Sequence, residues 1–258
     1  MERLSANTRP AGISDGALRA WALIFLLCGV VGRGLIQNVL LGLNNMDSNQ
    51  LLQFLNETDG AMGMVTLSLV LTAMESCAVP IFAFLLVEGY LHTSSYKKYL
   101  IRTVVLAMVS EVLYNIAMSG SVLDMQTRNS VWCVVLGLVM LGLFRYVDEK
   151  MNGRKLVKIV MAVAGLLWAS MLKVEHGVFF MAMVLTLWSM RGKRQFRLFV
   201  GMGVAALCTA ISPFYLAATM GFMAIHFYNG EKTESGRLIN YAAYPAMLLL
   251  CALAPLFL

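Results

Sequence analysis

Glu88 and His92 stand four residues apart at the end of an apolar run, in the stretch IFAFLLVEGYLHTSSYKKY at residues 81–99. If this run is helical, the carboxyl and the imidazole lie on one face. A carboxylate beside an imidazole orients the ring and favours its protonated form, which suits a general base or the activation of a nucleophile. The plainer interpretation is a helix end at a membrane surface, and the two residues alone favour it.

Three basic residues follow His92 within ten positions: Lys97, Lys98 and Arg102. Cationic side chains in this place could hold the phosphates of a nucleotide-like cofactor. They equally fit the excess of Lys and Arg that marks the cytoplasmic loops of membrane proteins. Composition alone does not separate these two interpretations.

Four ionisable residues interrupt apolar segments: Arg33, Glu75, Glu88 and Glu111. Such residues are costly within a membrane span, so each is a candidate functional residue. Arg33 could pair with Glu75, and a structural ion pair is slightly favoured over a functional one. Glu111 is either a carboxyl held by interhelical hydrogen bonds or a catalytic or proton-relay acid, and both interpretations stay open.

Transmembrane helices are the elements that must position these side chains. Apolar residues make up 59% of the 258 residues and charged residues 13%, with a mean hydropathy of +0.74. Soluble domains carry about 25% charged residues. Several apolar runs reach the roughly 20 residues that a helix needs to cross a bilayer. The sequence therefore predicts an all-α, polytopic transmembrane helical bundle, with one membrane domain over residues 1–258.

The apolar runs predict about nine spans, within a range of eight to ten, at 18–43, 62–91, 99–119, 129–147, 156–172, 177–190, 196–211, 214–229 and 238–257. With a cytoplasmic N-terminus, seventeen of the 20 Lys and Arg residues fall on the cytoplasmic side, as the positive-inside rule requires. Among them are Arg3, Arg9 and Lys232. This placement explains the net charge of +6 with a lipid bilayer as partner and without nucleic acid. The loop that carries Glu175 and His176 falls outside.

Motifs for several other chemistries are absent from the sequence. The five cysteines all lie in apolar runs, which predicts small buried side chains rather than disulfides or metal ligands. The chain has no Gly-rich loop with a P-loop lysine, no C-x-x-C, no H-E-x-x-H and no G-x-S-x-G. ATP hydrolysis, metal-dependent proteolysis and the usual serine hydrolase arrangement are therefore disfavoured, and no metal site is expected.

The stretch PIFAFLLVEGYLHTSSYKKYLIRTVVLAMVSEVLYNIAMSG, at residues 80–120, resembles the TraX family of membrane proteins. The residues that match in order are Pro80, Phe82, Phe84, Glu88, Gly89, His92, Thr93, Lys98, Tyr99, Arg102, Ser110 and Glu111. A weaker likeness runs over nearly the whole chain, for example at Tyr228-Asn229-Gly230 and at Tyr244-Pro245.

The resemblance implies an acetyltransferase of the bacterial cytoplasmic (inner) membrane that moves an acetyl group from acetyl-CoA to an N-terminal amine. It implies that His92, oriented by Glu88, is the base or the acyl acceptor, and that Glu111 lines the cavity. The residues that would hold CoA are Lys97, Lys98 and Arg102. In the family the acceptor is a pilin subunit; here a pilin-like protein and a small amine are both compatible with the sequence.

The chain departs from the family pattern at three positions. The family's first span usually carries an Asp-His pair where this chain has Gly29 and Val30, and Met247 stands where a histidine usually follows the Tyr-Pro. A homologue that has lost catalysis and acts as a membrane partner is therefore one alternative. A proton-coupled transporter is another, motivated by the buried acids Glu75 and Glu111, although the chain lacks the internal repeat that many carriers show.

Overall fold

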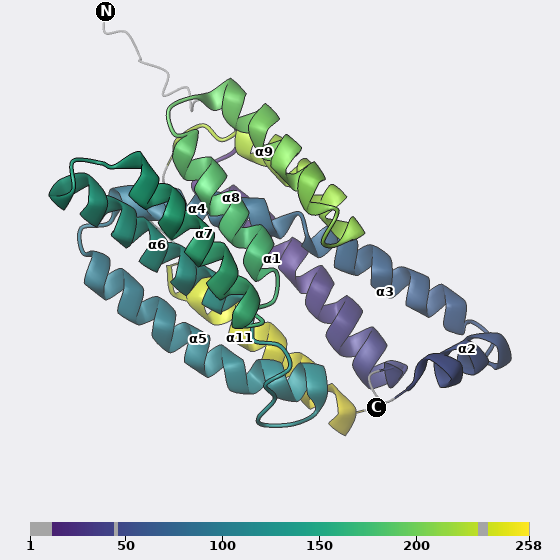
Figure 1. Ribbon diagram of the computed structural model, residues 1–258. Coiled ribbons are helices and arrows are strands. Elements are labelled where there is room, and N and C mark those ends of the chain that lie inside the picture. Colours follow the sequence, from purple (N-terminus) through teal and green to yellow (C-terminus); the bar gives the residue numbers. More distant parts are fainter. Residues whose placement is uncertain (1–11, 44–45, 232–236, 258) are drawn as a thin grey trace, which may run out of the picture.

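The computed structural model describes residues 12–43, 46–231 and 237–257, with the backbone alone at 237–240 (Figure 1). Arg3, Arg9 and Lys232, which contribute to the predicted charge topology, lie outside the described residues. All regular secondary structure in the described residues is helical, and two isolated β-bridges join Ile13 to Tyr228 and Arg128 to Val174. The all-α prediction is confirmed.

The helices follow one another along the chain with short connections. The α-helices of the described residues are α1 (Asp15–Gly29), α2 (Ser48–Glu57), α3 (Ala61–Glu75), α4 (Ala78–His92), α5 (Tyr96–Ser119), α6 (Val131–Lys150), α7 (Lys155–Met171), α8 (Gly177–Ser189), α9 (Arg194–Cys208), α10 (Ala218–His226) and α11 (Arg237–Leu253). A π-helix, η1 (Val30–Leu40), continues α1. The 3-10 turns whose residues are all described include η3 (Pro213–Leu216) before α10 and η4 (Ala254–Leu256) after α11.

Helices occupy all nine predicted ranges, and the second range holds two α-helices, α3 and α4. Within the described part of the chain, four helical stretches are long and apolar enough to cross a membrane: Asp15–Leu40, Ala61–His92, Tyr96–Ser119 and Val131–Lys150. The remaining apolar helices are shorter. The count of nine spans and the cytoplasmic N-terminus therefore stay predictions.

Pro80 explains why α3 and α4 are separate helices. Proline lacks an N–H, and its ring clashes with the carbonyl of the residue four positions earlier, here Ser76. The chain breaks at that point: the N–H of Ser76 donates to the Ala73 carbonyl at 3.1 Å, and the N–H of Cys77 to Met74 at 3.0 Å. Pro80 then falls in the first turn of α4, where its missing donor costs little. The second predicted span is therefore divided into two helices at Ser76 and Cys77.

Helix α4 lies at the centre of the bundle, in contact with α1, α6, α8 and α10 (Figure 1). Most of its side chains are buried, including Ile81, Phe84, Leu86 and Val87. A helix that is apolar on every side is stable only when other apolar groups surround it. This burial fixes the position and tilt of α4, and with them the Glu88–His92 end of the helix.

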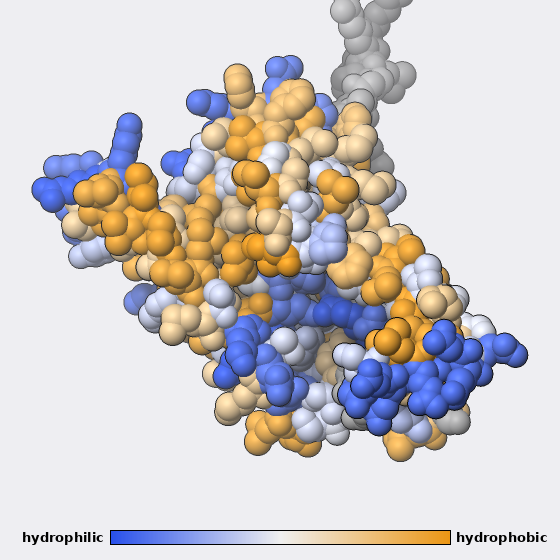
Figure 2. Space-filling model, turned by 45° about the vertical axis from the view of Figure 1, so that its right-hand side comes forward, coloured by the Kyte–Doolittle hydropathy of each residue, from blue (hydrophilic) through white to orange (hydrophobic). Residues whose placement is uncertain are grey.

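The outer surface of the bundle carries many exposed apolar side chains. On α5 an apolar stripe is formed by Ile101, Val105, Met108 and Val112, each more than 40% exposed. Figure 2 shows broad hydrophobic areas over the helices, with hydrophilic areas concentrated toward the ends of the molecule. Soluble monomers rarely expose apolar surface on this scale, so the surface supports a membrane protein.

Candidate functional site

The Glu88–His92 pair lies at the C-terminal end of α4. The Nδ1 atom of His92 is 2.8 Å from the backbone oxygen of Glu88 and 3.6 Å from its carboxylate Oε2. A carbonyl oxygen only accepts, so Nδ1 carries the hydrogen and the neutral ring presents Nε2 as a proton acceptor. The His92 side chain is 49% exposed, so Nε2 is open to a second molecule.

A sharp turn after His92 brings the start of α5 beside this pair. Thr93 is extended and ends α4, and the Ser95 hydroxyl accepts the N–H of Lys98 to begin α5. Gly89 lets the first turn of α5 approach closely, because a Cβ at this position would lie 3.2 Å from the Tyr99 hydroxyl. The first turns of α5 are thereby held against the last turn of α4.

The basic residues predicted to hold CoA all lie near the beginning of α5. Lys97, Lys98 and Arg102 are exposed, and none makes an ion pair with a carboxylate of the described residues. Lys98 and Arg102 are one helical turn apart and share a face. The structure thus brings these three cations to the same end of the bundle as His92.

Arg197, on α9, is a further cation at this end of the bundle. Its guanidinium carbon lies 4.8 Å from the centre of the Phe84 ring, on the turn of α4 before Glu88, and its charge interacts with Glu88. Arg197 begins the second turn of α9, more than 100 residues from α4 in sequence. The only sequence signal for this contact was the basic cluster at 191–197.

Glu111 lies far from His92, toward the opposite end of α5. At about 1.5 Å per residue, Glu111 is about 22 Å along the helix from Tyr96. Its Oε2 accepts the backbone N–H of Asn129 at 3.2 Å, the Asn129 amide at 2.5 Å and the Trp132 indole N–H at 3.0 Å. A carboxylate at this place also interacts favourably with the N-terminus of α6. The geometry supports interhelical hydrogen bonding by Glu111.

Replacement of Glu111 by alanine should destabilise the fold by roughly 2 to 3 kcal/mol, because three donors at the start of α6 lose their acceptor. Glu111→Gln retains one oxygen and should keep most of the stability and all of the activity. Chemical unfolding in detergent measures the first effect, with the exposed Glu57→Ala as control. An alanine variant that is fully stable but inactive would contradict the structural role and support the catalytic one.

A buried polar cluster, formed by Arg33, Glu75, Glu175, His176 and Tyr215, lies inside the bundle. Arg33 Nη2 contacts both Glu75 carboxylate oxygens, at 2.7 and 2.6 Å, and Arg33 Nη1 forms an ion pair with Glu175. His176 Nδ1 is 3.2 Å from the Tyr215 hydroxyl, and His176 Nε2 is 3.8 Å from Glu75 Oε2. Glu75 is only 2% exposed. The predicted Arg33–Glu75 pair is therefore confirmed, within a larger network.

The end of α1 and the turn before α8 allow the side chains of the buried polar cluster to approach one another closely. Gly29, the last residue of α1, faces the Glu75 carboxyl, and a Cβ there would lie 2.0 Å from the Glu75 Cδ. His176 adopts a left-handed backbone with φ of 56° and caps α8, which turns the loop before α8 into the bundle. Gly29 and this turn together leave room for two carboxylates, a guanidinium and an imidazole.

Glu175 and His176 were predicted to lie in an outer loop, and their part in the cluster was missed. Both side chains are largely buried, at 7% and 15% exposure. Ligand atoms of Glu75, Glu175 and His176 also lie within 4.8 Å of one another, as metal ligands do. Because Arg33 already supplies a positive charge to both carboxylates, the network fits an ion-pair cluster better than a metal centre.

Comparison with known proteins identifies one family. The family model described as TraX protein matches residues 50–254, which include the Glu88–His92 pair, the start of α5 and Glu175–His176. The matched residues do not include α1 or η1, so Gly29, Val30 and Arg33 lie outside the match. No curated protein and no solved structure matches the chain.

Proposed function

Because the chain belongs to the TraX family, we propose that it is a membrane acetyltransferase that transfers an acetyl group from acetyl-CoA to an amine. The observation that supports this most strongly is the Glu88–His92 pair, where the imidazole presents an exposed Nε2 acceptor at the end of a rigid, buried helix. The bacterial cytoplasmic membrane, with this helix end facing the cytoplasm, is the location that the charge distribution favours.

In this proposal His92 acts as a general base on the acceptor amine. The amine nitrogen attacks the thioester carbonyl, its proton passes to His92 Nε2, and the carbon–sulfur bond breaks as CoA leaves. His92 then returns the proton to the CoA sulfur, so the products are an amide and free thiol. The Glu88 carboxylate, 3.6 Å from Nδ1, stabilises the imidazolium that forms in between. Alternatively, His92 Nε2 itself attacks the thioester and carries the acetyl group to the amine.

The exposed cations at the start of α5 are suited to the phosphates of acetyl-CoA. Lys97, Lys98 and Arg102 make no ion pair with a carboxylate of the described residues, so their charges are available to an anionic substrate. Charge-assisted hydrogen bonds to phosphate are about twice as strong as neutral ones. We assign the diphosphate of CoA to this basic surface, and the acceptor to a pilin-like protein or a small amine.

A proton-coupled carrier is the second candidate, and the buried polar cluster is the observation that favours it. Paired ionisable groups inside a membrane bundle often mark an ion or proton pathway. Arg33 and the two carboxylates sum to one negative charge when His176 is neutral, so protonation of His176 would neutralise the cluster. This candidate requires proton-dependent flux in liposomes that Glu75→Gln removes.

Acetyl-CoA binding separates the proposals without knowledge of the acceptor. A ligand that binds only the folded state stabilises it, by about 2.7 kcal/mol at one hundred times its Kd. We expect a saturable rise in the Tm of the purified protein with acetyl-CoA, and the same rise for His92→Ala, because a base is not needed for binding. A folded protein without any shift would contradict the acetyltransferase and leave the carrier or a non-catalytic membrane partner.

A further inference from the structure

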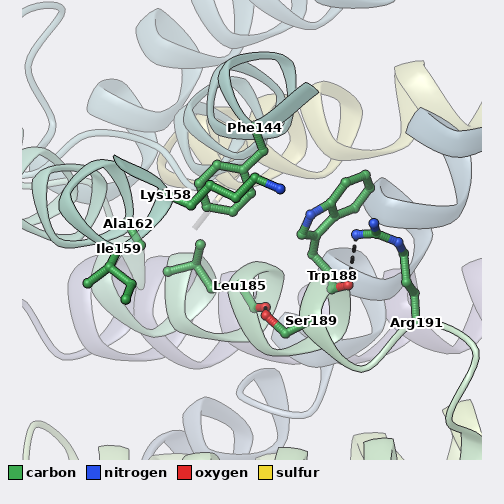
Figure 3. Close-up of a pocket in the computed structure, with 8 residues that line it drawn as sticks. All are labelled: Phe144, Lys158, Ile159, Ala162, Leu185, Trp188, Ser189 and Arg191. Atoms are coloured by element: carbon green, nitrogen blue, oxygen red, sulfur yellow. Dashed lines mark hydrogen bonds between the residues drawn. The ribbon is translucent and has the colours of Figure 1, made fainter. Parts of the chain in front are cut away.

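A groove opens between α6, α7 and the end of α8 (Figure 3). It measures about 460 Å³, within the range of small-molecule sites. It lies where α6 ends and α7 begins, the end of these helices that the charge topology places in the cytoplasm. One part of its wall is apolar, with Ile159, Ala162 and Leu185, and another part carries Lys158 and Arg191.

Arg191 and Lys158 give this groove cationic hydrogen-bond donors for an anionic ligand. The Arg191 guanidinium lies 3.9 Å from the centre of the Trp188 ring and donates to the Trp188 carbonyl at 3.2 Å. It makes no ion pair with a carboxylate of the described residues. Lys158 forms an ion pair with Asp148, at 2.5 Å, and its ammonium has two further donors. Both side chains extend toward Trp188 (Figure 3).

A second groove of about 320 Å³ adjoins the first and leads toward His92. The two grooves share Trp188 and Arg191, and the second is also lined by Tyr90 and Leu91, the residues directly before His92. The rings of Trp188 and Tyr90 are 5.8 Å apart. A ligand that occupies both grooves therefore extends from the apolar wall to the last turn of α4, which carries the residue proposed as base.

We propose that the larger groove binds the 3′-phosphorylated adenosine end of CoA, with the phosphate between Lys158 and Arg191 and the adenine against the apolar wall. The diphosphate then passes Tyr90 and Leu91 to the basic residues at the start of α5, and the pantetheine arm turns back to present the thioester to His92. The planar adenine ring suits the apolar part of the wall, and the neighbouring phosphate suits the cationic part. Guanidinium planes also stack on aromatic rings, as Arg191 already does. This inference rests on the proposed acetyltransferase function.

Binding of adenosine 3′,5′-bisphosphate to the purified protein tests this assignment by calorimetry. We expect Arg191→Gln and Lys158→Gln each to raise its Kd about tenfold, because each removes a charge-assisted contact to phosphate. The Kd for acetyl-CoA should rise in parallel. The matched controls are the exposed neighbours Lys193→Gln and Lys155→Gln, which should change Kd by less than twofold. Unchanged unfolding of each variant shows that the fold is intact.

The outcomes separate this inference from the proposed function. If the wild type binds acetyl-CoA and both groove variants bind it equally well, the groove assignment is wrong and the acetyltransferase stands. If the wild type binds neither acetyl-CoA nor the bisphosphate, both proposals fail. If inorganic phosphate or anionic lipid vesicles compete as well as the bisphosphate does, the groove is a general anion site and the adenosine assignment is wrong.

Discussion

His92→Ala should lower the rate of acetyl transfer by about two to four orders of magnitude, the range that a positioned base contributes. The loss should appear in kcat, with little change in KM for acetyl-CoA, because the proposed contacts to CoA come from other residues. The side chain ends α4 and is 49% exposed, so its removal leaves no cavity and should barely alter stability. Release of free CoA thiol with a primary amine as acceptor measures the rate.

Glu88→Gln provides the matched test of the pair. It preserves the shape of the side chain and the backbone oxygen that fixes His92 Nδ1, and it removes only the charge 3.6 Å from the ring. We expect a smaller loss than for His92→Ala. A His92→Ala protein that retains full activity would exclude His92 as base and as acyl acceptor.

Gly29→Ala should destabilise the protein by about 3 kcal/mol, the lower end of the cost of breaking a buried ion pair. The new methyl group would lie 2.0 Å from the Glu75 Cδ, and Glu75 is held by Arg33 and buried. The carboxylate must therefore leave Arg33 or the helices must separate. Chemical unfolding in detergent measures the change.

Gly63→Ala is the matched control, because a Cβ at Gly63 on α3 meets nothing within 4 Å. In a helix this exchange should stabilise by about 0.5 to 1 kcal/mol. A double variant with Glu75→Ala identifies the mechanism: once the carboxyl is gone, Gly29→Ala should cost much less. If Gly29→Ala lowers the free energy of unfolding equally in the wild type and in the Glu75→Ala variant, the effect of Gly29 does not depend on Glu75.

The sequence predicts those features well that depend on residues close together along the chain. Apolar runs locate the helices, because backbone N–H and C=O groups inside a membrane must form their hydrogen bonds within the same segment. Arg33 and Glu75 were paired correctly, because both stand deep in apolar segments where neither charge is stable alone. Pro80 lies inside the second predicted span, and because proline acts on the residue four positions back, that span is broken at Ser76 and Cys77.

The parts of the site that depend on long-range folding were not predictable from single positions. Loop charges suggested an outer location for Glu175 and His176, and no local pattern shows that a left-handed residue turns this loop into the bundle. Glu111 shares a predicted helix with Arg102, but only the position of α6 reveals that its carboxylate binds Asn129 and Trp132. The distance between Glu111 and His92 follows directly from the length of α5.

The most direct test of the proposed acetyltransferase is transfer itself, measured with the purified wild-type protein in lipid vesicles. Acetyl-CoA with a labelled acetyl group is supplied with a panel of peptide N-termini and small amines, and mass spectrometry detects the acetylated product. We expect an amide product in equal amount to the free CoA thiol, dependent on the protein and lost with His92→Ala. If the protein binds acetyl-CoA but forms no amide and releases no CoA with any amine, the proposed activity is wrong.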